Sequence, residues 1–449
     1  MSEQLRGQLI ATIGAEFVST IALAPTTLGS MTEGNNINLA ALASDFFRVV
    51  PRTPAEVAEV MALCTSHRVP VHPEGSGRRP TPHARDRDRV FVSTRRLDQV
   101  VQLDETSLLL HAQAGVTGTR LQEILAPRNL TLGDYPPSVL TPSLGGIIAV
   151  RTPGKSSARH GFFEDAVVGV SAVLANGRTV HTRVAPRRAT GPDLLRALCG
   201  SEGTVGFITS AVVRIHHQPE ARFASAYILP TLDAAIASVY LALREEAAPS
   251  GIRIYDLAET TAHFRGLPIV EQVAAKSATG ALMVVGTAGP TDLAACDRDL
   301  IASAVLAEGG ETATDEVAKL WWRRLHHGES TPAAPPTFQA MATPRKIAST
   351  YRAVVEAAAA AGGSARAHVS RFDADGAVVF FSVIRNSKTL AAEVTDAHDV
   401  ALVEVCKRAA TQAGGWLPGS RALRLDPYFA SLRAELDPLG IMNPGAFAE

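Results

Sequence analysis

Apolar residues recur at helical spacing between residues 52 and 68 of the sequence. Thr53 can cap the start of a helix, and Glu56, three residues later, completes a capping box. Pro54 suits the first turn, because its missing amide hydrogen is not needed there. The pattern therefore predicts a helix that begins at Pro54 and buries one apolar face, formed by Val57, Val60, Met61 and Cys64.

The rest of the first 220 residues alternates short apolar runs with turn signals, whereas residues 1–46 show no strong pattern. The predicted buried strands are 107–115, 166–180 and 209–217. An Asn-Gly turn falls at residues 176–177, inside the second of them. Residues 191–200 predict a short helix, because Pro192 comes early and Gly200 follows its end.

The pattern changes near residue 221, where longer helices begin to alternate with strands. The predicted helices are 232–247 and 347–363, and the predicted strands are 281–289 and 376–384. The last stretch, "LDPLGIMNPGAFAE", is rich in Pro and Gly for a chain end. We therefore expect a discontinuous first domain that the C-terminus rejoins, with domains at 1–220 and 221–414 and a returning segment at 415–449.

The composition restricts the classes of partner. A chain of 449 residues is long enough for two or three domains with a large core. The net charge is -1, and no basic stripe interleaved with aromatic residues is visible, which argues against nucleic acid or a membrane surface as the main partner. We expect a small-molecule substrate instead and leave a homodimer open.

The four cysteines, Cys64, Cys199, Cys296 and Cys406, form no CxxC pair, which argues against a zinc site or a disulfide framework. No stretch approaches the roughly 20 apolar residues of a transmembrane span. The segment "FVSTIALAPTTLG" at 17–29 is short and lacks a basic flank, so it does not resemble a signal peptide. These features favour a reduced, cytoplasmic location and no bound metal.

Three glycine-rich loops lie in the first half of the chain. The first runs from Pro73 to Arg79, the second contains Gly145 and Gly146, and the third is "GSEGTVG", residues 200–206. Glycine lets other groups approach the backbone closely, and successive amides in such turns can bind an anion. Three such surfaces suit an extended dinucleotide, although the first loop alone could be an ordinary turn.

The order of these motifs resembles the FAD-linked oxidase family with the vanillyl-alcohol-oxidase-type, also called PCMH-type, flavin domain. The resemblance rests on "SLGGIIA", "GPDLLRALCGSEGTVGFIT" and "DPLGIMNPGA" and covers nearly the whole chain. Within that family the chain is most similar to alkyldihydroxyacetonephosphate synthases, through "ATGPDL" and "SGIRIYD". The resemblance implies an α+β fold with a two-part PCMH-type FAD-binding domain and a mixed α/β substrate cap.

The resemblance also implies which residues meet the cofactor. Residues 73–79 would hold the FAD pyrophosphate, 137–156 would follow the flavin, and 200–206 would close the site. Glu202 would bond a hydroxyl group of the cofactor or cap the local backbone, and both readings stay open. The implied FAD-binding residues are Pro73, Glu74, Gly75, Ser76, Gly77, Arg78, Arg79, Pro137, Ser138, Ser143, Gly145, Gly146, Thr152, Gly154, Ser201, Glu202, Gly203, Gly206, Ile208 and Asn443.

The FAD is expected to be non-covalent. Several relatives attach the flavin through a histidine in the first loop, and Arg78 stands at that position here. The cysteine that some relatives use as a second anchor is also missing, because no cysteine lies between residues 65 and 198.

The catalytic residues of the synthases are not matched. Their cap tyrosine falls on Asp373, or on Phe372 with a one-residue gap, and their histidine run falls on Gly419, Ser420 and Arg421. His368, Ser370 and Arg253 do match family positions, and Arg324 matches the arginine that binds the anionic end of the substrate. A structural histidine and a solvated helix arginine are the competing readings of His368 and Arg324. The candidate catalytic residues are His368, Asp373, Arg324, Arg253, Arg371 and Arg421.

The function expected from the resemblance is an FAD-dependent oxidoreductase that oxidises a small polar or anionic alcohol, or a hydroxy acid, by hydride transfer to flavin N5. Either His368 or Asp373 could be the base if burial tunes it toward neutral pH. Two alternatives remain, namely a redox-neutral transferase or lyase of synthase type and a flavoprotein that has lost catalysis.

Overall fold

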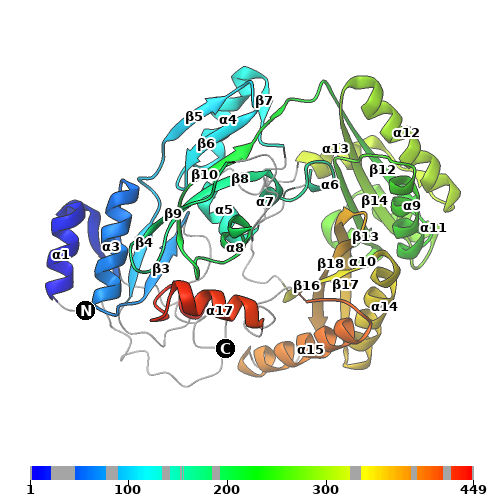
Figure 1. The fold of residues 1–449 in the computed structure, drawn as a ribbon. Coiled ribbons are helices and arrows are strands. Elements are labelled where there is room, and N and C mark those ends of the chain that lie inside the picture. The colour runs from blue at the N-terminus through cyan, green and yellow to red at the C-terminus, as the bar shows by residue number, and fades with distance from the viewer. Residues whose placement is uncertain are drawn as a thin grey trace. The chain divides into compact units, whose positions relative to one another are not determined.

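The computed structural model describes residues 3–21, 46–76, 89–133, 142–151, 154, 156–184, 193–323, 335–385, 392–417 and 426–446. The chain forms two compact units, each built from segments far apart in the sequence (Figure 1). The first unit contains Met1–Pro153, Gly161–His217 and Gly419–Glu449, and the second contains Gly154–His160 and Gln218–Pro418.

A four-stranded mixed sheet opens the first unit, in the order β1-β2-β4-β3. Its strands are β1 (Val18–Ile21), β2 (Phe46–Val49), β3 (Val71–Glu74) and β4 (Val90–Ser93). β1 is antiparallel to β2, whereas β2 and β3 both run parallel to β4. Helices α1 (Glu3–Ile13) and α3 (Pro54–Ser66) pack on each other and share a buried core with the sheet, and the 3₁₀ turn η1 (Ala15–Phe17) links α1 to β1.

A five-stranded antiparallel sheet completes the first unit, in the order β5-β6-β10-β8-β9. Its strands are β5 (Val100–Asp104), β6 (Leu109–Gln113), β8 (Val167–Val173), β9 (Thr179–His181) and β10 (Phe207–Arg214). The helices that share its core are α4 (Gly118–Leu125), α5 (Leu144–Val150), α7 (Phe163–Ala166), α8 (Leu194–Leu198) and α17 (Pro427–Leu436). The turn η3 (Ala126–Arg128) leads into β7 (Leu130–Thr131), which pairs with β11 (His216–His217).

The second unit is built on a seven-stranded antiparallel sheet, in the order β15-β12-β14-β13-β17-β18-β16. Its strands are β12 (Ala221–Leu229), β13 (Gly251–Asp256), β14 (Ala281–Gly289), β15 (Glu311–Thr312), β16 (Thr337–Ala342), β17 (Gly363–Asp373) and β18 (Gly376–Arg385). Successive side chains of a strand point to opposite faces, so each face has its own core.

Helices cover both faces of this sheet. One face carries α9 (Leu232–Arg244), α12 (Thr291–Ala307), α14 (Pro344–Ala360) and α15 (Ala392–Gln412). The opposite face packs on α10 (Leu257–His263), α11 (Pro268–Lys276) and α13 (Asp315–Arg323). The short helix α6 (Ser157–His160) contacts β13 and β17. No helix in the described part of the chain has the length and apolarity needed to span a bilayer.

Most predicted elements are present, with local corrections. α3 has the predicted cap, because Thr53 accepts a bond from the Glu56 amide, and its four predicted apolar residues are buried. The reciprocal bond of a capping box is absent, because the Glu56 carboxylate accepts from the Arg52 amide at 2.6 Å instead. The predicted strand 166–180 is two strands, β8 and β9, joined by a turn in which Gly177 has φ +82°.

Two features were not predicted. Helix α1 lies in a region without a strong pattern, although Leu5, Leu9 and Ile13 recur every fourth residue and are buried. Three residues at one spacing are too few to distinguish a helix from chance. The segment Gly154–His160 belongs to the second unit, although the sequence on both sides of it belongs to the first.

The C-terminal segment rejoins the first unit beside β3. Val71 donates its amide to Ile441 and accepts a bond from the Asn443 amide, at 2.8 and 2.7 Å. The buried Asp437 carboxylate accepts from the amides of Ile441 and Met442, which fixes the turn before that contact. The "DPLGIMNPG" motif therefore acts as an extra strand segment alongside β3.

We predict that acid weakens the first unit through His72. Its Nδ1 donates to the Asn443 side-chain oxygen at 2.7 Å, and burial lowers its pKa to about 4. Between about pH 6.5 and pH 4, His72 is protonated in the unfolded chain but stays neutral in the folded protein. The free energy of unfolding should therefore fall by up to about 3 kcal/mol as the pH is lowered through this range. The variant His72→Gln keeps a donor without titrating. Urea unfolding of both proteins at pH 7, 6 and 5 measures the difference, and parallel pH curves would contradict the prediction.

Candidate functional site

The glycine loops of the first unit meet at their glycines. A Cβ atom at Gly75 would lie 2.6 Å from the Ser143 hydroxyl oxygen and 3.6 Å from Cα of Gly146. A Cβ atom at Gly203, whose φ is +75°, would lie 2.8 Å from the Pro73 ring. The first loop therefore contacts both other loops, and glycine is required because a side chain would separate them.

Asn443 connects β3, which leads into the first loop, with the third loop. Its side-chain amide donates to the Glu202 carbonyl at 2.6 Å, its side-chain oxygen accepts from His72, and its backbone amide donates to Val71. The Glu202 amide donates in turn to the carbonyl of Ala149, at the end of α5. Glu202 has φ +50°, so its backbone is held in an unusual conformation by bonds on both sides.

Unsatisfied polar atoms lie beside the first loop. The hydroxyl groups of Ser93 and Thr94 are buried and have no hydrogen-bond partner among the described residues. Ser93 pairs with Glu74 in the sheet, and the Thr94 amide donates to the Glu74 carbonyl at 2.9 Å. Buried hydroxyl groups normally find a partner, so this edge of the loop is suited to a polar ligand.

The structure assigns other tasks to some of the predicted cofactor residues. The Glu74 carboxylate receives two bonds from the Arg48 guanidinium, at 2.7 and 2.8 Å. A side chain at Gly145 would meet Ala114, and one at Gly206 would approach the Val173 carbonyl, so both glycines serve packing. The Ile208 side chain belongs to the core under the five-stranded sheet.

The remaining cofactor predictions divide into three groups. Gly154 belongs to the second unit. Pro73, Gly75, Ser76, Ser143, Gly146, Ser201, Glu202, Gly203 and Asn443 belong to the first unit and lie on or next to the segments just described. Gly77, Arg78, Arg79, Pro137, Ser138 and Thr152 lie outside the described residues.

The second unit gathers polar side chains on the sheet face opposite the α9–α14 core. Arg253 of β13 is directly opposite Ser370 of β17 in the register, and His368 is opposite Tyr255. Nε of Arg253 and the Ser370 hydroxyl are both buried and have no hydrogen-bond partner among the described residues. A guanidinium nitrogen and a hydroxyl group side by side can bind a carboxylate or phosphate oxygen.

A buried carboxylate anchors the next part of this face. Glu259 is on the first turn of α10, and its side chain is 4% exposed. One carboxylate oxygen lies 2.7 Å from Nε of Arg366, and the other lies 3.4 Å from Nδ1 of His368 and 3.5 Å from Nδ1 of His263. Asp256 positions this helix, because its carboxylate caps the Glu259 amide and also accepts from the Ala367 amide of β17.

The surroundings of His368 favour the neutral imidazole. Burial lowers the pKa of His368 well below its usual range, and the charges of Arg253, His263 and Arg371 act in the same direction. The ring stacks on Phe380, with centroids 4.7 Å apart and planes 10° from parallel. His368 is thus held in one orientation in its basic form, which is suited to accepting a proton.

Arg371 reaches the same face through a β-bulge. The pairing of β17 with β18 shifts between Ser370 and Asp373, and Arg371 has φ +57°. Without the bulge, Arg371 would point to the face opposite Ser370. Instead its guanidinium lies 4.7 Å from the Phe380 ring centre, and it donates to the Gln339 side chain at 3.3 Å.

Asp373 does not have the environment expected of a tuned base. It is exposed at the β17–β18 turn, where its carboxylate accepts from the adjacent Ala374 amide. Burial, on which that expectation depended, is therefore missing. Phe372, the gapped alternative for the family tyrosine, is buried in the core on the opposite face of the sheet. Arg324 and Arg421 lie outside the described residues.

Sequence reasoning missed Glu259 and Arg366. In "YDLAET" the Asp-x-x-Glu spacing resembles an ordinary helix cap, and Asp256 does cap the helix. The Glu259 side chain, however, turns to Arg366, which is 107 residues away in the sequence. The alternation of Arg366 and His368 along one strand was the available signal that both face one side.

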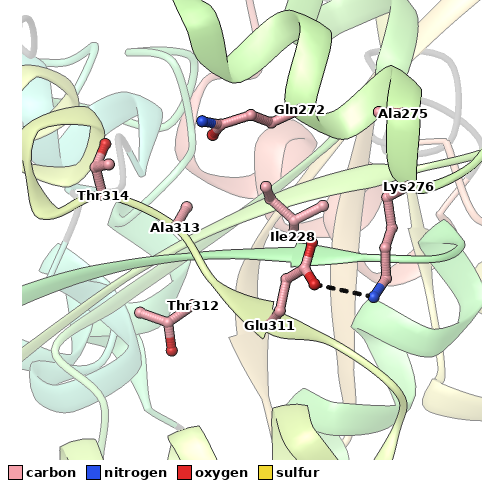
Figure 2. A pocket seen from close by; sticks show the side chains of 8 residues that line it. All are labelled: Ile228, Gln272, Ala275, Lys276, Glu311, Thr312, Ala313 and Thr314. Carbon is pink, nitrogen blue, oxygen red and sulfur yellow. Dashed lines mark hydrogen bonds and ion pairs between the residues drawn. The ribbon is translucent and has the colours of Figure 1, made fainter.

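A separate pocket of about 610 Å³ lies between α11 and the β12–β15 edge of the second unit. Figure 2 shows Lys276 and Glu311 pointing toward each other there, and their charged groups are 3.2 Å apart. The described residues that line it include none of the Arg253, His368 or Glu259 cluster. Because Lys276 and Glu311 form an ion pair with each other, this pocket is a weaker candidate for a reactive site than the cluster of Arg253, His368 and Glu259.

Two protein families match consecutive parts of the sequence. Residues 47–183 match the FAD binding domain family, and residues 218–447 match the C-terminal domain of FAD linked oxidases. The second match alone covers more than half of the chain.

Curated relatives match more locally. Alkyldihydroxyacetonephosphate synthase of Dictyostelium discoideum is 30% identical over 224 residues, which are 49% of this chain and 36% of that protein. Glycolate oxidase subunit GlcD of Bacillus subtilis is 28% identical over 216 residues, which are 46% of this chain and 45% of that protein. The matched region thus spans well under two thirds of each relative.

Solved structures match along the whole chain. A structure of alkyldihydroxyacetonephosphate synthase has a TM-score of 0.78 at 20% identity, over 99% of this chain and 86% of that one. A structure of 4-ethylphenol oxidase from Gulosibacter chungangensis has a TM-score of 0.75 at 14% identity, over 100% of this chain and 98% of that one.

These likenesses define the class: a mixed α/β flavoprotein fold of the PCMH and vanillyl-alcohol-oxidase type, with an FAD-binding domain and a C-terminal cap domain. The chain belongs to the FAD-linked oxidase family.

We predict that Gly203→Ala destabilises the protein. A side chain there must adopt a left-handed conformation, which costs roughly 1–2 kcal/mol, and must also displace Pro73. The matched control is Gly7→Ala in α1, where no heavy atom lies within 4 Å, so about 0.5–1 kcal/mol of stabilisation is expected. Urea unfolding measures both changes. The same response from both glycines would show that the Gly203 turn is not constrained.

Proposed function

We propose that this chain is an FAD-dependent oxidoreductase that oxidises a small polar or anionic alcohol, with a hydroxy acid as the preferred class. The observation that supports it most is the group of Arg253, Ser370 and His368 on one sheet face. It combines two buried polar atoms that have no hydrogen-bond partner among the described residues with an imidazole held in its neutral form.

The first unit has the features that FAD binding requires. The loops at Gly75, Gly146 and Gly203 approach one another through glycines, and the hydroxyl groups of Ser93 and Thr94 are available beside them. We propose that these loops hold FAD without a covalent bond. When bound, FAD would supply the hydride acceptor at its N5 atom.

The residues of the second unit would bind and deprotonate the substrate. Arg253 and Ser370 would bind its carboxylate or phosphate group, because a guanidinium can bond two oxygens at once. His368 would accept the hydroxyl proton at its Nε2 atom while the substrate loses its hydride. The positive charges of Arg253 and Arg371 favour an anionic substrate.

The relative from Bacillus subtilis is named as a subunit of glycolate oxidase, and glycolate is a small hydroxy acid. The synthases suggest the alternative of a redox-neutral transferase. That alternative is less well supported, because Asp373 is exposed and Phe372 is buried on the other face, so neither replaces the family tyrosine.

An anaerobic screen tests the proposal. The holoprotein is mixed with glycolate, lactate, glycerate, malate, neutral sugars and amino alcohols while flavin absorbance is followed. Bleaching by a hydroxy acid supports the proposal. Turnover that leaves the flavin oxidised would favour the transferase, and neither bleaching nor turnover would favour a protein without catalysis.

We predict that acid or heat releases intact FAD from the purified protein. The reason is that Arg78 stands where several relatives carry the histidine that attaches the flavin. Precipitation with acid followed by chromatography of the supernatant measures the release. Flavin that stays with the denatured polypeptide would show a covalent bond.

We predict that Arg253→Leu raises the substrate concentration for half-maximal flavin reduction about 10- to 100-fold, since a hydrogen bond to a charged group contributes roughly 1.5–3 kcal/mol. Arg253→Lys should restore only part of the loss, because an ammonium group cannot reproduce the two-pronged geometry. The flavin spectrum should stay unchanged. Arg298→Leu is the control, because this half-buried arginine of α12 pairs with Asp299 and packs over Phe223. An equal effect from both leucine variants would contradict a binding role for Arg253.

A further inference from the structure

We propose that Glu259 positions His368 as the base and stabilises the imidazolium that forms when His368 accepts the substrate proton. This inference rests on the proposed function and adds a residue that the sequence did not indicate. Glu259 would act through His368 and would not touch the substrate.

The geometry defines the proton positions. A carboxylate oxygen can only accept, so the Glu259 oxygen 3.4 Å from Nδ1 of His368 favours the tautomer with hydrogen on Nδ1. Nε2 then keeps its lone pair for the substrate proton. Hydrogen bonds of catalytic groups are often long without substrate and shorten in the complex.

Electrostatics explain why a carboxylate is needed here. Arg253 and Arg371 oppose a positive charge on His368, and burial opposes it more strongly. Proton transfer would therefore create an imidazolium in surroundings that disfavour it. Glu259 provides the compensating negative charge, and its own position is fixed by Arg366 at 2.7 Å.

Other charged and titratable groups lie around Glu259 and His368. From β13 these are Arg253, Tyr255 and Asp256, from β17 they are Arg366, His368 and Arg371, and from α10 there is His263. His263 approaches the same carboxylate oxygen as His368, but its side chain is 45% exposed. It can be replaced without uncovering the buried site, which makes it the matched control.

The proton is conserved in this scheme. The substrate O–H bond would break and its proton would join Nε2 of His368. The C–H bond would break as the carbonyl forms, and its hydride would go to the acceptor that bound FAD supplies. Glu259 stays a carboxylate throughout and takes no proton. His368 returns the proton to solvent after the product leaves.

The first experiment needs no substrate. Histidine imidazoles of the holoprotein are labelled with ¹³C, and the His368 signal is titrated by NMR in wild type, Glu259→Gln and His263→Gln. Loss of the carboxylate should lower the pKa of His368 in Glu259→Gln, whereas His263→Gln should not lower it. An unchanged His368 titration in Glu259→Gln would overturn the inference, whatever the enzyme's substrate proves to be.

The second experiment uses the hydroxy acid that bleaches the flavin fastest in the screen. Glu259→Gln should lower the limiting rate of flavin reduction about 10²- to 10³-fold, the size of a general-base effect, with little change in the half-saturating concentration. The acid limb of the rate profile should move to lower pH. Glu259→Asp keeps the charge and should lose less, and His263→Gln should stay within a few-fold of wild type.

The two experiments distinguish failure of the proposed function from failure of the inference about Glu259. If no compound bleaches the wild-type flavin, the proposed function fails, while the NMR titration still tests the contact between Glu259 and His368. If Glu259→Gln unfolds, Glu259→Asp takes its place in both experiments. Its shorter side chain keeps the carboxylate but moves it away from Nδ1 of His368, so a smaller fall in the His368 pKa and in the limiting rate is expected, and no fall in either would overturn the inference. If Glu259→Gln raises only the half-saturating concentration and leaves the acid limb in place, Glu259 is a structural residue and the inference is wrong.

Discussion

The flavin-binding unit depends on the hydrogen bonds of Asn443. This one residue bonds the strand that precedes the first glycine loop, through Val71 and His72, and the backbone of the third loop, through Glu202. Asparagine suits the task because its side chain offers both a donor and an acceptor. Without it, two segments with strained or glycine-dependent backbones would have unpaired groups at the place where they meet.

The second unit is organised by a charge imbalance. Arg366 lies against Glu259, and Arg253 and Arg371 lie near His368, on a sheet face that also buries aromatic rings. Arg366 pairs with one oxygen of Glu259 and the other oxygen lies beside His368, while the charges of Arg253 and Arg371 both disfavour a positive charge on His368. Buried positive charge is costly unless a negative charge lies beside it. The same positive charge therefore explains both the proposed preference for an anionic substrate and the proposed need for Glu259 beside the His368 imidazolium.

The sequence predicted features that depend on local chemistry. The cap of α3, the Asn-Gly turn and the motif that contains Asn443 all follow from residues close together in the chain. Features that depend on distant partners were missed or misread. Glu259 resembles a helix cap until Arg366 is placed beside it, and Arg371 reaches the His368 face only because of a bulge. Asp373 lacks the burial on which its expected role as a base depended, because it lies in the exposed turn between β17 and β18.

The returning C-terminal segment has a consequence for biosynthesis. His72 and Asn443 bond to each other across 371 residues of sequence, and the second unit's main segment, Gln218–Pro418, lies between them in the chain. The ribosome must therefore deliver the whole second unit before β3 acquires its last neighbour. During that interval the edge of β3 has unpaired backbone groups, so this strand is where a nascent or truncated chain would recruit a chaperone or pair wrongly with another copy.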